Sequence, residues 1–570
     1  MYPGACRLAR LASLVVALVA ALGTALAPAC APRPGTATVS RPSPGVAAAL
    51  PRTRAERTDY RETSRYEDVI VFLDSLRLRG APIVISAIGK TTEGRDIPMV
   101  RVDRLPDDRS SVRGARRRRP VVYVQANIHA GEVEGKEAML ALLRDLAFAP
   151  APSVLDSVEL LVVPIYNADG NERLAAQRLN RAEQNGPELV GERANAQRLD
   201  LNRDYVKTEA PETVAALEAL RAWNPDVFVD LHATDGSYHG YALTYAPSLS
   251  PAALSGGPYA RDVLLPAVRE RVRERHGFET FDYGNFLSEE DPSRGWATYD
   301  ARPRFGTNYM GLRGRIAVLS EAYSHDPFER RVRSTYAFVR ELLSYVAEHS
   351  ARILALSDRA DRDLLDWAQR PSRAPEIPVR ARLTTQPARG ELLVEDVERT
   401  GDSTVYEPGL PPGVRRPSRA RPVEMPLFLR FEPTLTRPMP YAYVLIEPEQ
   451  PVLQRLRVHG IAMRTLAHEW TARVDRFTVD SVHRDERLFQ GHHEMRLDGR
   501  WTSDRHRLPK GAVVVPMAQQ LGVLAMYLLE PESDDGLVTW NFFDRSLTPG
   551  AEFPVLRLAE PLSEFRVQAP

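Results

Sequence analysis

Residues 121–143 read VVYVQANIHAGEVEGKEAMLALL, which joins the pattern of a buried strand to that of an amphipathic helix. Its first part is a continuous β-branched and apolar run, which is typical of a strand that is covered on both faces of a sheet. Apolar residues such as Met139 and Leu142 then recur on one helical stripe, and Glu132 is expected to open this helix. Because His129 lies three positions before Glu132, a tight turn can bring an imidazole and a carboxylate to the same side, where they can hold a metal ion.

Three further runs have the composition of buried strands. They are VELLVVPIYN at 158–167, DVFVDLH at 226–232 and GRIAVLSE at 314–321. Strands that alternate with helices over about 300 residues indicate an α/β domain. We therefore predict a mixed, mostly parallel central sheet with helices on both faces, followed by a strand-rich C-terminal region.

The composition divides the chain into four parts. Arg7 and Arg10 precede an apolar run at 11–27, which is the layout of a secretory signal peptide; an uncleaved anchor helix is the alternative. The next residues are rich in Pro, Ala and Ser, which favours a disordered linker. The predicted parts are a signal peptide at 1–29, a linker at 30–58, an α/β domain at 59–368 and a strand-rich domain of unknown role at 376–570.

The chain has two cysteines, Cys6 and Cys30. Because Cys6 would leave with the signal peptide, we expect no disulfide within the mature chain. Cys30 ends the run LAPAC, which loosely resembles a bacterial lipoprotein cleavage site, although Pro28 departs from the usual small residue. We expect an exported protein that is periplasmic, secreted or a cell-envelope lipoprotein, with a possible membrane tether through lipidated Cys30.

The charges are balanced, with 75 Lys and Arg against 75 Asp and Glu. No overall field therefore favours a nucleic acid, and we predict no nucleic-acid partner. The basic run RGARRRRP at 113–120 is predicted to be a solvated loop before a strand.

Three of the predicted strands end in a potential metal ligand or catalyst: His129, His232 and Glu321. In open α/β sheets, sites form outside the carboxyl ends of the strands, so these side chains can converge on one crevice. Two histidines and one glutamate leave a fourth position open for water, which is the ligand set of catalytic zinc.

With these residues the chain resembles the zinc carboxypeptidase family, the metallocarboxypeptidases of the A/B type, over roughly residues 60–345. The resemblance rests on several motifs in one order. They are TTEGRDIPMVRV, NIHAGEVEGKEA, YNADGNER, LDLNRDY, DLHATDG and LSEAYS.

The resemblance implies one zinc ion per chain, bound by His129, Glu132 and His232. It also implies that Glu321 is the general base, which takes a proton from the zinc-bound water and passes it to the leaving amine. A carboxylate suffices as the base because zinc lowers the pKa of bound water to about 7.

The resemblance assigns substrate contacts as well. Asn202 and Arg203 would hold the terminal carboxylate of the substrate, and an arginine fork matches a carboxylate with two parallel hydrogen bonds. Arg193 would steady the oxyanion, with Arg198 as the alternative five residues on.

The family also has a mobile tyrosine some twenty residues before its glutamate. Tyr299 has that spacing, while Tyr309 lies in the more motif-like RFGTNYMGLRGR, and the sequence leaves both open.

Together these features predict an exported zinc metallocarboxypeptidase that hydrolyses the C-terminal peptide bonds of peptides or proteins. One alternative is a zinc amidase or a peptidase of cell-wall peptides on the same scaffold, since a scaffold does not fix its substrate. A remote alternative is an inactive, peptidase-like binding protein whose C-terminal half is the working module.

Overall fold

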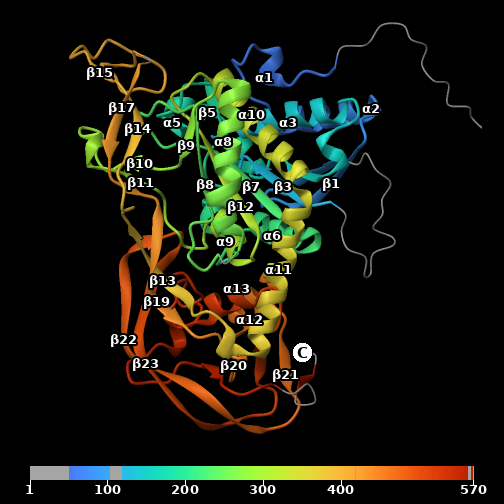
Figure 1. Ribbon diagram of the computed structural model, residues 1–570, viewed down its shortest axis with the longest axis vertical. Helices are drawn as coiled ribbons and strands as arrows, with labels where there is room; N and C mark the ends of the chain where they lie inside the picture. The colour runs from blue at the N-terminus through green and yellow to red at the C-terminus, as the bar shows by residue number, and fades with distance from the viewer. Residues whose placement is uncertain (1–49, 103–118, 254, 418, 563–566, 569–570) are drawn as a thin grey trace, which may run out of the picture. The chain divides into compact units, whose positions relative to one another are not determined.

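The computed structural model describes residues 50–102, 119–253, 255–417, 419–562 and 567–568. The described residues from Leu50 onward form one compact unit (Figure 1). The predicted signal peptide, Cys30 and most of the basic run at 113–120 lie outside the described residues. No helix in the described ranges is long and apolar enough to cross a membrane.

A central sheet organises the first part of the described chain, with the strand order β1-β2-β4-β3-β7-β12-β8-β9. Strand β3 is parallel to β4 and β7, β7 is parallel to β12, and β8 is parallel to β9; the other pairs are antiparallel. The sheet confirms the predicted mixed, mostly parallel α/β fold. Its strands are β1 (Ile83–Lys90), β2 (Asp96–Val102), β3 (Val121–Ala126), β4 (Glu159–Val163), β7 (Val227–Ala233), β8 (Leu243–Pro247), β9 (Thr280–Asp282) and β12 (Ile316–Ala322).

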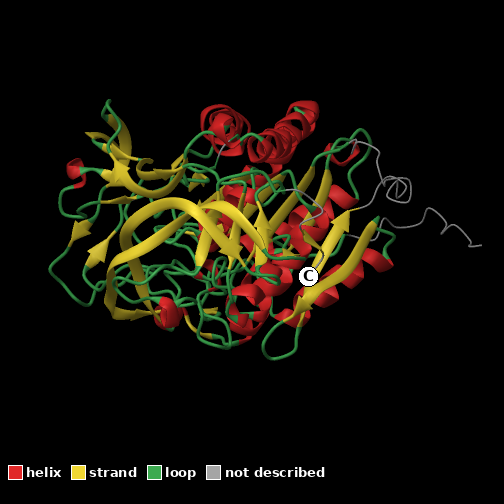
Figure 2. Ribbon diagram, turned by 90° about the horizontal axis from the view of Figure 1, so that it is seen from below, coloured by secondary structure: helices red, strands yellow, loops and turns green. Residues whose placement is uncertain are grey.

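Both faces of the sheet are covered, because successive side chains of a strand point to opposite faces. In β3, Val122 and Val124 enter one hydrophobic core, whereas Val121 and Tyr123 enter another. Helices lie on either side of the strands (Figure 2). The first core contains side chains of α2 (Tyr66–Leu78), α3 (Glu134–Ala147), α8 (Leu265–His276) and α10 (Phe328–Glu348); the second contains those of α6 (Pro211–Trp223) and α9 (Gly306–Leu312).

Helix α3 begins two residues later than predicted. Its first residue is Glu134, whereas the backbone N–H of Glu132 donates to the His129 carbonyl at 3.0 Å. Glu132 therefore belongs to the turn between β3 and α3.

The predicted linker at 30–58 contains a short helix, α1 (Arg54–Arg57). Thr53 and Glu56 form a capping box, in which the Thr53 N–H donates to Glu56 at 2.8 Å and the Thr53 hydroxyl accepts from the Glu56 N–H at 3.2 Å. Arg144 of α3 also pairs with Glu56 at 2.6 Å. This cap and ion pair give the end of the predicted linker a defined structure against α3.

The region after residue 376, called the C-terminal region below, is rich in strands, as predicted. Its largest sheet has the order β23-β22-β25-β20-β24-β21-β26 in the described chain. The strands are β20 (Ala442–Leu445), β21 (Arg464–Leu466), β22 (Trp470–Phe489), β23 (His492–Leu508), β24 (Val513–Pro516), β25 (Val555–Leu558) and β26 (Val567–Gln568).

In the strand-rich region, the apolar run GAVVVPMAQQLGVLAMYLL at 511–529 has a strand-like composition, which predicts a strand. This prediction is wrong for the second half of the run. Val513–Pro516 form β24, but Gly522–Leu529 form the helix α13, whose residues are all buried. An apolar run without polar interruptions shows no periodicity that separates a buried helix from a buried strand.

The remaining elements are short or lie between the two main sheets. The further helices are α4 (Ala168–Glu172), α5 (Gln177–Asn180), α7 (Gly256–Tyr259), α11 (Ser350–Gln369) and α12 (Gln450–His459), and η3 (Leu201–Arg203) is a 3-10 turn. The further strands are β5 (Ala175–Ala176), β6 (Leu189–Val190), β10 (Asn285–Phe286), β11 (Trp296–Ala297), β13 (Ile377–Thr384), β14 (Gly390–Glu395), β15 (Glu398–Arg399), β16 (Val414–Arg415), β17 (Ala420–Met425), β18 (Leu427–Phe428) and β19 (Arg430–Arg437).

One hydrophobic core joins the two predicted domains. The core that covers one face of the central sheet contains Phe228 and Tyr309, and it also contains Tyr443, Val515 and Leu524 of the C-terminal region. The boundary after residue 368 remains a prediction, but the two sides of it are packed together by apolar burial.

Candidate metal and catalytic site

The turn after β3 presents His129 and Glu132 side by side. Asn127 has a positive φ of 64°, and its side-chain amide donates to the carbonyls of Ala130 and Glu132 at 3.3 and 3.4 Å. At Gly131, a Cβ atom would lie 2.7 Å from the Arg181 side chain, so only glycine lets that arginine approach. The turn is thus held by local hydrogen bonds and by a close approach, and it brings the two predicted ligands together.

His232 and Glu321 end adjacent parallel strands. His232 lies on β7 and Glu321 on β12, and the two residues are directly paired in the register of these strands. Strand β3 lies on the other side of β7, so the carboxyl ends of all three strands meet at one edge. This is the convergence that the strand-end positions predicted.

His129, Glu132 and His232 form a compact set of donor atoms, and all three are buried. The His129 Nδ1 lies 2.9 Å from Glu132 Oε1, His232 Nδ1 lies 3.1 Å from Glu132 Oε2, and the two Nδ1 atoms are 3.1 Å apart. Ligands about 2.0–2.1 Å from a tetrahedral zinc ion are about 3.3 Å from one another. The three donors therefore have the chemistry and nearly the spacing of a zinc site.

A carboxylate contacts the Nε2 atom of each histidine. His129 Nε2 is 3.0 Å from Asp200 Oδ1, and His232 Nε2 is 3.2 Å from Asp230 Oδ2. Such contacts at the outer ring nitrogen fix the ring and leave Nδ1 free for a metal. Burial lowers the pKa of His232, but the carboxylates of Asp230, Glu132 and Glu321, with Asp230 the largest contributor, together raise it well above its ordinary value.

Two arginines contact the third donor. Arg181 Nη1 and Arg193 Nη1 donate to Glu132 Oε1 at 3.2 and 3.1 Å. Burial alone would raise the pKa of Glu132, but His129 and Arg181 hold it well below its ordinary value. The Glu132 carboxylate is therefore ionised, as a metal ligand must be.

Arg193 and Arg198, the two candidates from the sequence for stabilising the oxyanion, lie in different places. Arg193 Nη2 also pairs with Asp200 at 3.0 Å, and its side chain is 36% exposed beside the donor atoms. Arg198 pairs with Glu192 and its side chain is 73% exposed. Only Arg193 lies in the site.

Glu321 has no partner of its own. Its carboxylate makes no hydrogen bond or ion pair within the described part of the chain, although the residue is only 7% exposed. Burial raises its pKa well above the ordinary value; the positive charge of His232 opposes this rise, and the negative charge of Glu132 adds to it. A buried carboxylate that nothing else engages, next to a candidate metal site, is suited to proton transfer.

Asn202 and Arg203 lie in η3, which Asp200 caps. Asn202 is buried, and its Oδ1 accepts from the Gly306 N–H at 3.0 Å. The Arg203 guanidinium lies 4.1 Å from the centre of the Phe305 ring, and its Nη1 donates to the Asn202 carbonyl at 2.9 Å. Both predicted substrate residues are thus held close to Asp200 and hence to His129.

The structure separates the two candidate tyrosines. The Tyr309 hydroxyl bonds His459 Nδ1 of the C-terminal region at 2.9 Å, and Tyr309 is fully buried in the core. Tyr299 is partly exposed, and burial together with the nearby charge of Glu321 raises its pKa. Of the two candidates, Tyr299 is therefore the one near Glu321.

Three charged residues of the site were not found from the sequence. Asp230 precedes His232 by two positions on one strand, so it lies on the same face, and that spacing was an available signal. Asp200 lies two residues before Asn202 in LDLNRD. Arg181 reaches Glu132 from a segment without a regular pattern, and no local signal could have found it.

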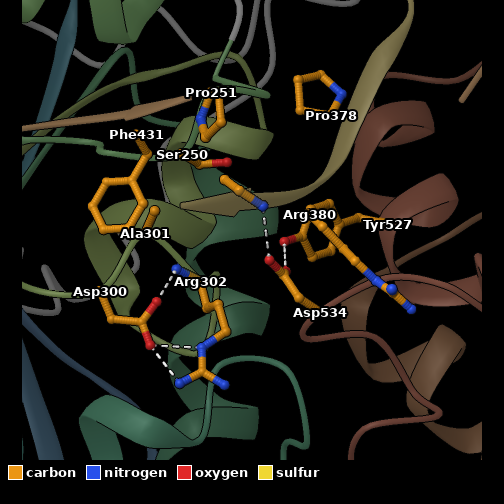
Figure 3. A pocket seen from close by; sticks show the side chains of 11 residues that line it. Ser250, Pro251, Asp300, Ala301, Arg302, Pro378, Arg380, Phe431, Tyr527 and Asp534 are labelled. Carbon is orange, nitrogen blue, oxygen red and sulfur yellow. Dashed lines mark hydrogen bonds and ion pairs between the residues drawn. The ribbon is translucent and has the colours of Figure 1, made fainter. Parts of the chain in front are cut away.

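A pocket of about 230 Å³ lies beside residues 300–302 (Figure 3). Asp300 accepts from the Arg302 guanidinium at 2.6 Å, and Arg380 pairs with Asp498 at 3.0 Å. Burial raises the pKa of Asp534 to about 6, and this carboxylate accepts from the Tyr527 hydroxyl. Ser250 and Asp300 of the central-sheet part of the chain line the pocket together with Phe431 and Asp534 of the C-terminal region, so the pocket lies between these two parts. The charged side chains that line it are paired, and none is a candidate metal ligand.

Comparison with known proteins gives a family match. The family described as Zinc carboxypeptidase matches residues 70–276, a range that contains the three donors but ends before Glu321. Carboxypeptidase 2 of Trichophyton rubrum is 25% identical over 509 residues, which cover 82% of this chain and 81% of the relative. Carboxypeptidase 2 of Trichophyton tonsurans is 24% identical over 495 residues, with 82% and 81% covered.

Solved structures are more distant. A metallo-carboxypeptidase from Burkholderia cenocepacia is 19% identical, covers 50% of this chain and 70% of its own, and has a TM-score of 0.38. A metallo-carboxypeptidase from Pseudomonas aeruginosa, in complex with (2-guanidinoethylmercapto)succinic acid, is 20% identical, covers 51% and 70%, and also has a TM-score of 0.38.

Proposed function

We propose that the chain is a metallopeptidase of the zinc carboxypeptidase family and that it removes C-terminal residues from peptides or proteins. The match of the family over residues 70–276 and the similarity to Carboxypeptidase 2 of Trichophyton rubrum support this proposal. The observation that carries this proposal is the convergence of two histidines and two glutamates at one edge of the central sheet. The two histidines and Glu132 offer their atoms to one point, while Glu321 beside them is left without a partner.

His129, Glu132 and His232 would hold one zinc ion per chain. Their donor atoms lie about 3 Å from one another. Asp200 and Asp230 contact the Nε2 atoms of the two histidines and so orient their rings. Bound there, zinc supplies a Lewis acid that lowers the pKa of water to about 7.

Glu321 would act as the general base and then as the general acid. Its carboxylate has no competing hydrogen bond, so it is free to take the proton of the attacking water and to give it to the leaving amine. Its pKa is raised by burial, which makes it a stronger base than an exposed glutamate. Arg193, with its side chain partly exposed beside Glu132, would stabilise the developing oxyanion.

Asn202 and Arg203 would bind the terminal carboxylate of the substrate. Arg203 is stacked on Phe305 and bonded to the Asn202 carbonyl, so its planar fork is held in one orientation. The arrangement favours a substrate that ends in a free carboxylate.

Two peptides that differ only at the C-terminus test the function. The purified protein should release the terminal residue from the free peptide and spare the amidated one. A chelator should stop the release, and added zinc should restore it. Equal cleavage of both peptides would contradict a carboxypeptidase and would favour an amidase on the same scaffold.

We also propose that the protein is exported and that Cys30 can carry a lipid, because an apolar segment with Arg7 and Arg10 before it precedes this cysteine. Wild-type protein should then partition with the membranes of its host, and Cys30→Ala should release it. Soluble wild-type protein would remove the tether and leave the enzymatic proposal unchanged.

A further inference from the structure

A hairpin of the C-terminal region reaches the predicted substrate site. Strands β22 and β23 are paired along their length, and the turn between them consists of Gln490 and Gly491. Both turn residues have positive φ angles, 51° and 84°. Such two-residue turns favour Asn or Gly at the first position, so the longer glutamine side chain is an unusual choice there.

The Gln490 side chain is engaged outside the hairpin. Its Oε1 accepts the backbone N–H of Asp200 at 2.9 Å. The Asp200 carboxylate in turn contacts three groups of the site: His129 Nε2 at 3.0 Å, the Asn202 N–H at 2.9 Å and Arg193 Nη2 at 3.0 Å. One hydrogen bond thus links the hairpin turn to the residue that connects the metal site with the predicted carboxylate site.

The same hairpin holds a second segment through Glu494. The Glu494 carboxylate accepts from Arg304 at 2.5 Å and from Arg302 at 3.0 Å. Arg304 is nearly inaccessible to solvent, and Asp535 of the C-terminal region accepts from its backbone N–H at 2.7 Å and from its Nε at 2.9 Å. The C-terminal region therefore fixes both the backbone and the side chain at residue 304.

The next two residues of that segment contact the predicted carboxylate pair. The Phe305 ring lies under the Arg203 guanidinium, and the Gly306 N–H donates to Asn202 Oδ1 at 3.0 Å. The hairpin thus reaches Asn202 and Arg203 by two separate routes, one through Asp200 and one through residues 304–306.

We infer that Gln490 and Glu494 are positioning residues for the substrate-carboxylate site, so that the C-terminal hairpin is a working part of the active centre. They would not touch the substrate; they would hold the segments at 200–203 and 304–306 at the separation that two parallel hydrogen bonds to a carboxylate require. Because Asp200 keeps its own bonds to His129 and Asn202, zinc binding and proton transfer should depend on Gln490 less than substrate affinity does.

Gln490→Met tests the first route, because methionine keeps the length of the side chain and removes the acceptor. Gln369→Met makes the same change at an exposed position at the end of α11 and is the matched control. For the peptide with a free C-terminus, Gln490→Met should raise KM about five- to tenfold, the worth of one lost hydrogen bond, while kcat stays within about twofold. Zinc content and Tm should match those of the control.

Two further measurements make the result independent of turnover. Hydrogen exchange of the segment at 199–206 should speed up in Gln490→Met and stay unchanged in Gln369→Met. Glu494→Gln, which weakens the pairing with both arginines, should raise KM for the same peptide through the second route. The inference is wrong if Gln490→Met equals its control in KM or in exchange, or if its kcat falls while KM is unchanged.

The KM readout rests on the proposed function, whereas the exchange readout does not. If the wild-type protein cleaves no free C-terminus, the proposed function fails, and unchanged exchange at 199–206 would separately overturn the role of Gln490.

Discussion

Asp230 and His232 lie on the same face of β7, with 3.2 Å between Asp230 Oδ2 and His232 Nε2. The carboxylate therefore holds the outer nitrogen of the ring while Nδ1 turns toward His129 and Glu132. Contacts of this kind orient a ligand and raise its basicity. The pair predicts a graded loss of metal when either residue is changed.

For the metal site, His232→Ala should abolish stoichiometric zinc, and Asp230→Asn should weaken zinc affinity about 10- to 100-fold. Metal analysis after dialysis, followed by competition with a chelator, measures both. Arg198→Ala is a suitable control, because this exposed arginine pairs only with Glu192 among the described residues. Full zinc retention in His232→Ala would contradict the assigned ligand set.

For substrate recognition, Arg203→Ala should raise KM for a peptide with a free C-terminus by the equivalent of about 1.5–3 kcal/mol, the worth of a hydrogen bond to a charged group. Arg203→Lys should recover only part of this, because lysine keeps the charge and loses the planar fork. Steady-state kinetics on free and amidated peptides measure the effect. An equal change for both peptides would show that Arg203 does not bind the carboxylate.

The two tyrosines should separate catalysis from stability. Tyr309→Phe removes the hydrogen bond to the buried His459 and should cost about 1–3 kcal/mol of unfolding free energy with kcat/KM nearly unchanged. Tyr299→Phe should lower kcat/KM by roughly three- to tenfold with little loss of stability, since its hydroxyl lies at a long 3.5 Å from Asn308. Denaturant unfolding and kinetics on both variants decide the assignment, and the reverse pattern would exchange their roles.

Acid should destabilise the protein through three buried histidines. Burial is the main cause that lowers the pKa of His239 to about 3 and those of His325 and His459 to about 4. The unfolded chain binds these protons at about pH 6.5, so below that pH it holds more protons than the native chain. The stability is therefore present above pH 6.5 and is lost as pH falls toward the native pKa values, by up to ~1.4 kcal/mol per unit for each histidine.

Chemical unfolding at pH 7.5 and at pH 5 measures this dependence. The free energy of unfolding should be lower at pH 5, and His459→Gln should reduce the difference by about 2 kcal/mol. An equal change of the free energy of unfolding in wild type and His459→Gln between these pH values would contradict the neutral state of His459.

Much of the site could be predicted from local sequence. His232 and Glu321 end runs of buried-strand composition, and the carboxyl ends of parallel strands meet at one edge, so their convergence followed from the fold class. His129 and Glu132 followed from a strand that ends in a turn before a helix.

Contacts over long separations could not be predicted in this way. Gln490 and Asp200 are hydrogen-bonded but lie 290 positions apart in the sequence, and Tyr309 and His459 lie 150 positions apart. The hydrophobic periodicity of these segments does not predict which distant residues they contact. The helix at Gly522–Leu529 was missed because it is apolar on all sides, so its stripe pattern is absent. Helix α1 was missed because its four residues are fixed by a cap and by Arg144 rather than by an apolar face.

Glu321 is proposed to move protons and not to hold the metal. Glu321→Gln keeps the size of the side chain and removes its basicity, so turnover of the free peptide should fall by about 10²–10⁴-fold. Zinc content and peptide affinity should stay close to those of the wild type, because the three donors and Arg203 are unchanged. The measurement is kcat of zinc-loaded Glu321→Gln on the free peptide, with zinc content determined on the same sample. A loss of that size with one zinc per chain is the predicted result, whereas near-wild-type turnover would show that Glu321 is not the general base.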